Sequence, residues 1–96
     1  MTPRTEIFVQ IDAERAYQQQ RWGDTTDDTK NTPWMWVAYI ARYATSWMVG
    51  SFPPIKRAET DSFRKFMLKV ATIAVAAIES IDRQRATNGK TFYEEN

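Results

Sequence analysis

Residues 33–50 read PWMWVAYIARYATSWMVG, and this stretch decides the fold because it encodes a helix without a polar face. Thr32 is a suitable N-cap, Pro33 suits the first helical position, and Gly50 suits the position after the last turn. Arg42 is the single charged residue of the stretch. Exposed apolar surface costs about 25 cal/mol per Å², so a helix that is apolar on all sides is predicted to be buried.

The whole chain has 96 residues, enough for one domain with a small hydrophobic core. A domain of this size can hardly surround a helix by itself. We therefore expect a second copy to cover one side of residues 33–50, in a homodimer or a higher homo-oligomer. A membrane span is not expected, because it needs about 20 apolar residues and Arg42 lies near the middle of this shorter stretch.

The composition excludes several classes of site. The chain has no cysteine and no histidine, so disulfide scaffolds, the usual zinc sites and Ser–His nucleophile pairs are impossible. With 13 basic and 12 acidic residues the net charge is near +1, which argues against nucleic acid as a partner. No secretory signal precedes the first predicted helix, and we expect a cytoplasmic protein.

The first helix is predicted over residues 5–21, and one of its faces mixes apolar and polar side chains. At spacings of four, three, four and four, this face carries Ile7, Ile11, Glu14, Gln18 and Trp22. A carboxylate and an amide within an apolar stripe indicate a binding site. Alternatively, the stripe turns toward the surface in its last turns, and Glu14 and Gln18 are simply solvated.

The remaining residues complete an all-α prediction with three main helices, forming a helical bundle that homo-oligomerisation completes. Residues 24–32, DTTDDTKNT, are predicted to form a loop with solvated aspartates, although their carboxylates are also possible cation ligands. The third helix is expected to begin near its N-cap candidates at residues 60–62 and to end at residues 88–89. Residues 90–96 are predicted to be a loose tail of the single domain.

Basic residues gather at the start of the third predicted helix. Residues 56–69 hold five basic and two acidic residues, a formal charge of +3, whereas residues 1–32 hold four basic and six acidic residues, a charge of −2. Lys65 and Lys69 are four residues apart and share a face. Because cations are unfavourable near a helix N-terminus, this placement suggests an anionic partner, with a solvated helix start as the alternative.

Three blocks of sequence together match a known pattern. They are ER-x-x-Q-x-x-x-WG at residues 14–23, WVAYI at residues 36–40, and FR at residues 63–64 followed by KVATIAVAAIESIDR at residues 69–83. This pattern resembles small phage and prophage proteins commonly labelled MazG-like, which are related to the all-α nucleotide pyrophosphohydrolases. The resemblance covers residues 6–85.

The resemblance implies a helical bundle that assembles as a dimer or larger oligomer and binds a nucleotide between helices. Active enzymes of this kind hydrolyse nucleoside triphosphates to the monophosphate and pyrophosphate, and hold Mg²⁺ with E-E-x-x-E and E-x-x-D motifs. In this sequence those positions are occupied by Arg42, Tyr43 and Ser46 on one helix, and by Phe66 and Lys69 on the other. We therefore expect no bound metal, no cofactor and no hydrolysis.

These observations predict a non-catalytic protein that binds a phosphorylated small molecule, most naturally a nucleotide. Aromatic side chains would stack on the base, and cations would pair with phosphate without a metal. The candidate ligand-binding residues are Glu14, Gln18, Trp22, Trp36, Tyr39, Arg42, Tyr43, Lys65 and Lys69. For a phage protein, one use of such a site would be to sequester a host nucleotide signal.

Two alternatives stay open. In the first, the aromatic residues form only the core of a dimer, and the basic stretch docks a host protein. In the second, a residual Mg²⁺-dependent pyrophosphohydrolase uses Glu14, Glu79 and Asp82. The last two of these acids lie one turn apart, near the other end of the third helix from the family's motif.

Overall fold

The computed structural model describes residues 2–47 and 54–95, and within these two ranges the chain is helical with no strand. Its elements are α1 (Pro3–Trp22), α2 (Asp24–Lys30), α3 (Pro33–Ser46) and α4 (Arg57–Asn88). The all-α prediction is confirmed, and a short fourth helix, α2, adds to the three main helices that were predicted. None of the helices in these ranges has the combination of length and apolar content that crossing a membrane requires.

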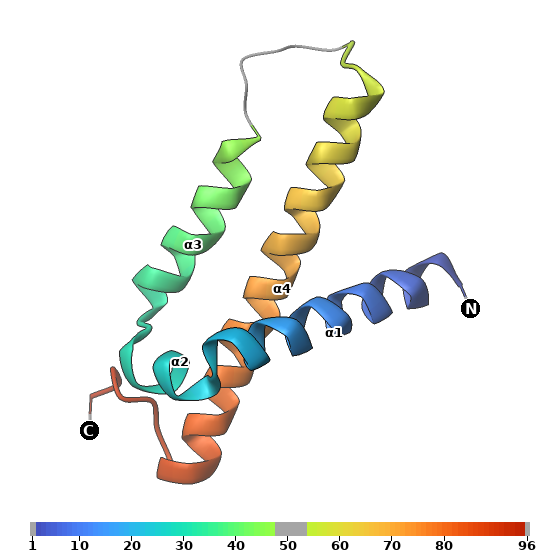
Figure 1. Ribbon diagram of the computed structural model, residues 1–96. Helices are drawn as coiled ribbons and strands as arrows, with labels where there is room; N and C mark the ends of the chain where they lie inside the picture. The colour runs from blue at the N-terminus through green and yellow to red at the C-terminus, as the bar shows by residue number, and fades with distance from the viewer. Residues whose placement is uncertain (1, 48–53, 96) are drawn as a thin grey trace.

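Helices α3 and α4 run side by side in opposite directions, and α1 crosses α4 (Figure 1). Helix α4 has 32 residues, about 48 Å at a rise of 1.5 Å per residue, and so runs nearly the full 51 Å length of the molecule. The first half of α1 projects beyond the other helices, and α2 lies in the corner between α1 and α3 (Figure 1). This corner is where the candidate site lies.

Residues 24–30 form helix α2 where the sequence predicted a loop. Gly23 has a φ of 76°, a left-handed value that lets the chain turn from α1 directly into α2. Acidic residues occupy the first turn of α2 and Lys30 its last turn, an arrangement that suits the helix macrodipole. No residue of α2 is buried. Ion pairs with Arg15 of α1 and Arg83 of α4 hold the helix in place.

The start of α3 agrees with the prediction. The hydroxyl of Thr32 accepts a hydrogen bond from the backbone N–H of Met35 at 3.4 Å, and Pro33 occupies the first turn. Gly50, the predicted end of this helix, lies outside the described residues. Helix α3 has 14 residues and ends at Ser46, with Trp47 as its C-cap.

Helix α4 begins earlier than predicted. Its N-cap is Lys56, which offers no side-chain hydrogen bond, and the cap candidates at residues 60–62 lie inside the helix. Glu59 in the first turn still favours this start through the macrodipole. The predicted end is confirmed, because Gly89 adopts a left-handed φ of 80° and its backbone N–H donates to the carbonyl of Arg85 at 2.9 Å.

Helix α3 is not surrounded by the chain. Trp36 is 8% exposed and belongs to the core, but Trp34 and Val37 on the outer side are 77% and 65% exposed. The single chain leaves this outer side uncovered because, among the described helices, α4 is the one that packs extensively against α3. The second copy expected to cover that side stays a prediction.

The buried interior of the described residues is small and of mixed polarity. Its apolar members are Trp36, Ile73 and Ala76, with Ile40, Tyr43 and Ala77 packed against them. The buried polar residues are Arg15, Asn31, Thr72, Ser80, Gln84 and Thr91. Polar contacts therefore hold the helices together alongside a limited apolar core.

The segment after α4 folds back onto the helix. Thr91 is fully buried, and the backbone N–H of Phe92 donates to Oε1 of Gln84 at 2.9 Å. Arg85 and Glu94 form an ion pair at 2.9 Å. The prediction of a loose tail is wrong for these residues, because polar side chains near the end of α4 satisfy the backbone and charges of the tail.

Candidate functional site

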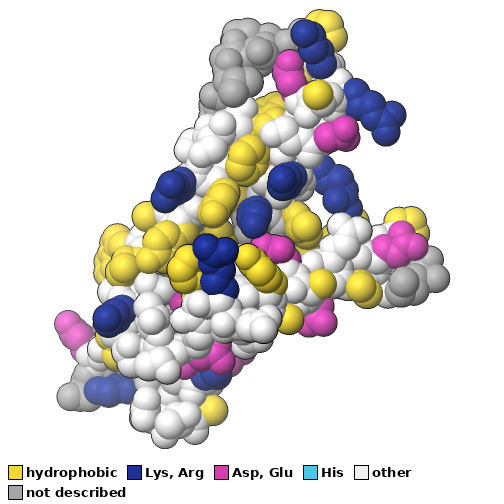
Figure 2. Space-filling model, viewed as in Figure 1, with side chains coloured by type: hydrophobic (Ala, Val, Ile, Leu, Met, Phe, Trp, Pro, Cys, Tyr) yellow, Lys and Arg dark blue, Asp and Glu magenta, His cyan; other side chains and the backbone are white. Residues whose placement is uncertain are grey.

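A cavity of about 620 Å³ lies where the four helices meet, within the size range of small-molecule sites. Helix α1 contributes most of its polar lining, α3 contributes aromatic side chains, α2 contributes a carboxylate, and α4 contributes a lysine and apolar residues. Figure 2 shows basic and apolar side chains gathered where α1 crosses α4, next to α3. This combination of charge and aromatic surface makes the cavity the candidate site.

Eight of the nine predicted ligand-binding residues line this cavity. They are Glu14, Gln18, Trp22, Trp36, Tyr39, Arg42, Tyr43 and Lys69. The ninth, Lys65, does not line it and is exposed on α4, about one turn before Lys69. Glu14 and Gln18 are half-buried, so the alternative in which both are simply solvated does not hold.

Lys69 is not free to meet a ligand phosphate. Its Nζ donates a hydrogen bond to Oε1 of Glu14 at 2.9 Å, which links α4 to α1. This hydrogen bond raises the pKa of Lys69 above its usual value, against the opposing effect of burial. The positive charge of Lys69 is thus already neutralised by an acid of the same chain.

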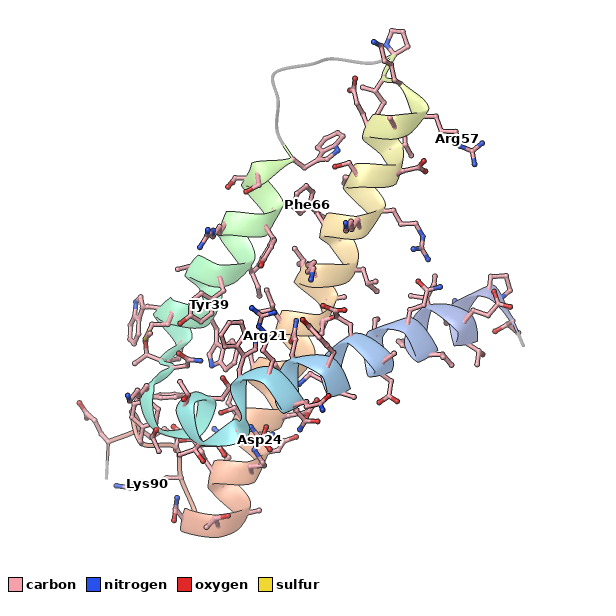
Figure 3. All side chains as sticks on the ribbon, in the orientation of Figure 1. Arg21, Asp24, Tyr39, Arg57, Phe66 and Lys90 are labelled. Atoms are coloured by element: carbon pink, nitrogen blue, oxygen red, sulfur yellow. The ribbon has the colours of Figure 1, made fainter. Side chains whose placement is uncertain are left out.

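Two arginines on the cavity wall have no carboxylate partner among the described residues. Arg21 of α1 donates to the Tyr17 hydroxyl at 2.9 Å and lies over the Trp22 ring, 4.9 Å from its centroid. Arg42 of α3 forms no side-chain hydrogen bond or ion pair within residues 2–47 and 54–95. Figure 3 shows Arg21 pointing from α1 toward α3, where Tyr39 lies. Both guanidinium groups can therefore still donate hydrogen bonds to an anion.

The aromatic side chains of α3 form a wall with fixed geometry. Trp36 and Tyr39 pack edge to face, with ring centroids 6.0 Å apart and an interplanar angle of 90°. Tyr43 lies one turn further along and contacts Phe66 of α4, at 6.2 Å between centroids. Because Trp36 is also a core residue, the packing of α3 on α4 sets the position of the wall.

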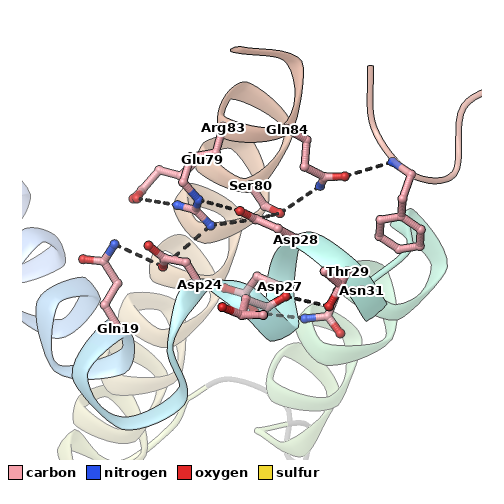
Figure 4. A network of polar contacts seen from close by, with 12 residues as sticks. Gln19, Asp24, Asp27, Asp28, Thr29, Asn31, Glu79, Ser80, Arg83 and Gln84 are labelled. Atoms are coloured by element: carbon pink, nitrogen blue, oxygen red, sulfur yellow. Dashed lines mark hydrogen bonds and ion pairs between the residues drawn. The ribbon is translucent and has the colours of Figure 1, made fainter. Parts of the chain in front are cut away.

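Helix α2 is held to α4 by a bidentate ion pair. Arg83 donates from Nε to Oδ2 of Asp28 at 3.0 Å and from Nη2 to Oδ1 at 2.9 Å, and the Ser80 hydroxyl donates to Oδ1 at 2.6 Å (Figure 4). Burial alone would raise the pKa of Asp28, but the hydrogen bonds from Arg83 and Ser80 hold it below its usual value. The same pairing raises the pKa of Arg83.

Arg15 of α1 completes this network from the other side. The residue is 5% exposed, with Nε 3.2 Å from Glu79 and Nη2 3.6 Å and 3.9 Å from Asp24 and Asp27. None of these contacts has hydrogen-bond geometry, and both nitrogens lack a hydrogen-bond acceptor. Arg15 therefore acts as a buried positive charge between α1, α2 and α4.

Asp27 connects this charge network to the aromatic wall. Its Oδ1 accepts a hydrogen bond from Nδ2 of Asn31 at 3.0 Å, and Oδ1 of Asn31 accepts one from the Tyr39 hydroxyl at 3.1 Å. Burial raises the pKa of Asp27, against the attraction of Arg15 and Arg83. The carboxylate, the amide and the phenol all belong to the cavity lining.

The three aspartates of α2 are neither solvated loop acids nor a cation site. They lie within ion-pair distance of Arg15 or Arg83. Within the described ranges, no group of three or more acidic residues is placed to hold a metal ion. Glu14, Glu79 and Asp82, the acids of the residual-hydrolase alternative, form no such group, and the first two are occupied by Lys69 and Arg15.

Eight lining residues were not among the predicted site residues: Arg15, Tyr17, Arg21, Thr26, Asp27, Asn31, Ile73 and Ala76. Arg21 carried a usable signal, because it lies seven residues after Glu14 and three after Gln18, on the same helical face. Asp27 and Asn31 carried no such signal, because their segment was assigned to a loop, where spacing does not define a face.

Comparison of the chain with protein-family models, curated proteins and solved structures finds no match. The relationship to MazG-like proteins therefore stays a prediction from the motifs quoted above. The chemistry of the site follows from its own geometry: two uncompensated arginines, an aromatic wall and one carboxylate that is held in place by an amide.

Proposed function

We propose that the cavity binds a phosphorylated small molecule, a nucleotide, without hydrolysing it. The observation that supports this most directly is the pair Arg21 and Arg42. These two cations come from different helices, line one cavity, and have no carboxylate partner among the described residues. An arginine fork pairs with phosphate oxygens through charge-assisted hydrogen bonds, so the pair suits a phosphate monoester.

The charge of the cavity supports an anionic ligand. Four cationic residues line it, namely Arg15, Arg21, Arg42 and Lys69, against the two carboxylates Glu14 and Asp27. The formal charge of the lining is thus 4 − 2 = +2. Because Lys69 and Arg15 are the two that contact carboxylates, the excess positive charge is concentrated at Arg21 and Arg42.

The aromatic surface supports a base as the other part of the ligand. Trp22, Trp36, Tyr39 and Tyr43 line the cavity together with the two arginines. Stacking of a base on an aromatic side chain contributes about 1–3 kcal/mol per base and tolerates different bases. A volume of about 620 Å³ is sufficient for a mononucleotide.

The proposed activity is binding rather than catalysis. Metal-dependent phosphate hydrolysis needs clustered carboxylates to hold hard cations, whereas the acids near this cavity are paired with Lys69, Arg15 and Arg83. The motif resemblance supports a nucleotide as the ligand. In this proposal the chain is a cytoplasmic phage protein of MazG-like type that sequesters a nucleotide, with docking to a host protein as the competing hypothesis.

We also propose that a second copy of the chain covers the outer side of α3. Trp34, Val37, Ala38 and Ala41 are all exposed and lie at spacings of three, four and seven residues from Trp34, so they form one apolar stripe. Three exposed apolar residues of α1, Ile7, Phe8 and Val9, add to the uncovered surface. Contiguous apolar patches of this kind mark association surfaces, and a homodimer would bury both.

Isothermal titration calorimetry at low salt tests the ligand proposal. The titrants are inorganic phosphate and the four ribonucleoside monophosphates, and the variants are R21A, R42A and R57A. Arg57 is an exposed arginine at the far end of α4, so R57A controls for the loss of one positive charge (Figure 3).

Binding of at least one nucleotide is expected, weakened about tenfold or more by R21A and by R42A and unchanged by R57A. Absence of heat for every titrant would contradict the proposal. An equal loss of affinity in all three variants would also contradict it, because the overall charge of the chain, and not a specific site, would then explain the binding.

A further inference from the structure

The α2 end of the cavity presents a carboxylate oxygen with free acceptor capacity. Asp27 lines the cavity and its side chain is 15% exposed. Its Oδ1 accepts the Asn31 amide, but its Oδ2 accepts no hydrogen bond from the described residues. The contact of Oδ2 with Nη2 of Arg15, at 3.9 Å, is an ion pair without hydrogen-bond geometry. A ligand donor can therefore use this oxygen.

The orientation of this carboxylate is fixed before any ligand arrives. Asn31 is 5% exposed, and its amide uses both ends, donating to Asp27 and accepting from Tyr39. Tyr39 in turn packs edge to face on Trp36. One chain of contacts thus ties the acceptor to the aromatic wall, and a ligand that uses both avoids much of the entropic cost of ordering them.

The four common bases differ in what they offer to a lone carboxylate. Guanine carries two adjacent donors, N1–H and the 2-amino group, which match the two oxygens of a carboxylate. Oδ1 of Asp27 can accept one of them beside the Asn31 amide, because each carboxylate oxygen has two acceptor sites. Adenine and cytosine each place an amino group beside a ring nitrogen that is an acceptor, and uracil places one N–H between two carbonyls. An acceptor that faces another acceptor leaves both unsatisfied, and a binding site rejects such a base strongly.

We propose that the cavity selects guanine nucleotides, with Asp27 accepting hydrogen bonds from N1–H and the 2-amino group while the base lies against the aromatic wall. Arg21 and Arg42 then hold the phosphate. Asn31 is a positioning residue in this arrangement, because it acts through Asp27 and Tyr39. The inference rests on the proposed nucleotide-binding function and adds the identity of the base.

Calorimetric titration of the wild-type chain with five monophosphates tests the selectivity: GMP, IMP, AMP, CMP and UMP. GMP should bind about tenfold or more tightly than AMP, CMP and UMP. IMP keeps N1–H but lacks the 2-amino group, so its affinity should lie between those of GMP and AMP. This order of affinities is measured on the wild-type chain, so it does not depend on any variant being folded.

The substitution D27N tests the contact directly. Asn at position 27 can keep its oxygen on the Asn31 amide and turn its NH₂ group toward the cavity, where the 2-carbonyl of xanthine would accept it. D27N should therefore bind xanthosine monophosphate more tightly than GMP, about a tenfold reversal of preference or more. A purely structural role of Asp27 would not produce this reversal.

Asp24 provides the matched control, because it lies on α2 and contacts the same Arg15, at 3.6 Å, but does not line the cavity. D24N should keep the preference for GMP. Equal affinities for GMP and AMP, or a D27N variant that binds with unchanged preference, would overturn the guanine inference and leave the proposed function standing. If none of the five monophosphates binds, both the guanine inference and the proposed nucleotide-binding function are contradicted.

Discussion

The Nζ atom of Lys69 lies 2.9 Å from Oε1 of Glu14, and this ion pair joins α4 to α1 along one side of the cavity. The pair changes the role of Lys69, which the sequence analysis counted among the cations available to a ligand phosphate. Lys69 neutralises an acid of its own chain. In the proposed binding mode the phosphate is therefore held by Arg21 and Arg42, which have no carboxylate partner among the described residues.

Replacement of Glu14 by glutamine (E14Q) should release Lys69 to the ligand. The affinity for nucleotide monophosphates should rise about three- to tenfold, because a third cation becomes available. The free energy of unfolding should fall by about 1 kcal/mol or less, since both side chains are partly exposed and screened. Calorimetry and urea unfolding measure the two effects, with E6Q on exposed α1 surface as the control. Unchanged or weaker binding would show that Glu14 does not restrain Lys69.

The pairing of Asp28 with Arg83 should make the fold sensitive to acid. The folded pKa of Asp28 lies below the ordinary 3.8, so its contribution to stability is present above that value and is lost as the pH falls through the folded pKa. D28N should lower the free energy of unfolding by about 2 kcal/mol at neutral pH and flatten its decrease below pH 4. Urea unfolding between pH 2.5 and 7 measures this, and the exposed Asp12 gives the control D12N. A variant as acid-sensitive as wild type would refute the assignment.

The three long helices could be predicted because their signals are local. Thr32 and Pro33 define the start of α3, and Gly89 defines the end of α4, within one turn of sequence. Helix α2 could not be predicted, because it has no apolar periodicity. What stabilises it are ion pairs with Arg15 and Arg83, and Arg83 lies 55 residues away from its partner Asp28.

The candidate site was predictable to the extent that helical spacing defines faces. Glu14, Gln18 and Trp22 share one face of α1, and Trp36, Tyr39 and Tyr43 share one side of α3, and these faces meet at the cavity. Spacing does not fix where along a 32-residue helix another helix crosses, so it could not separate Lys69 from Lys65. Helical spacing also does not show which charged side chains of different helices form ion pairs. Lys69 was therefore expected to be available to a ligand.

The close contact of α3 with α4 depends on a small side chain at Ala76, which is 3% exposed. The substitution A76L adds volume where Trp36 and Ile73 pack, at the wall of the cavity, and should lower the free energy of unfolding by about 1–3 kcal/mol. Ala86 is exposed on the same helix, and A86L should stay within about 0.5 kcal/mol of wild type. Chemical denaturation checks both variants, and equal stabilities would contradict the packing described here.

The outer stripe of α3 predicts the behaviour of the chain in solution. Wild type should run as a dimer or larger assembly in light scattering coupled to gel filtration. W34K places a charge where an apolar residue is 77% exposed and should yield monomer, whereas T87K on exposed α4 surface should not. A monomeric wild-type chain at high concentration would refute the second-copy proposal.

Selectivity for guanine should weaken in acid. Burial raises the pKa of Asp27 above the ordinary 3.8, and protonation removes an acceptor that the guanine contact needs. The ratio of GMP to UMP affinity should therefore be constant near neutrality and fall as the pH approaches this raised value. The ratio is the right quantity, because the phosphate groups of the two ligands titrate alike and uracil gains no proton in acid. A ratio that stays constant over the whole acid range in which the chain remains folded would exclude an ionised Asp27 from the contact.

Helix α2 contributes no buried side chain, so it is attached by ion pairs and hydrogen bonds rather than by apolar packing. Such an attachment depends on salt concentration, because dissolved ions screen the attraction between charged side chains and do not screen apolar contacts. Concentrated salt should thus loosen the end of the cavity that carries Asp27 while leaving the α3–α4 hairpin intact. The salt concentration would then determine whether α2 closes this end of the candidate site.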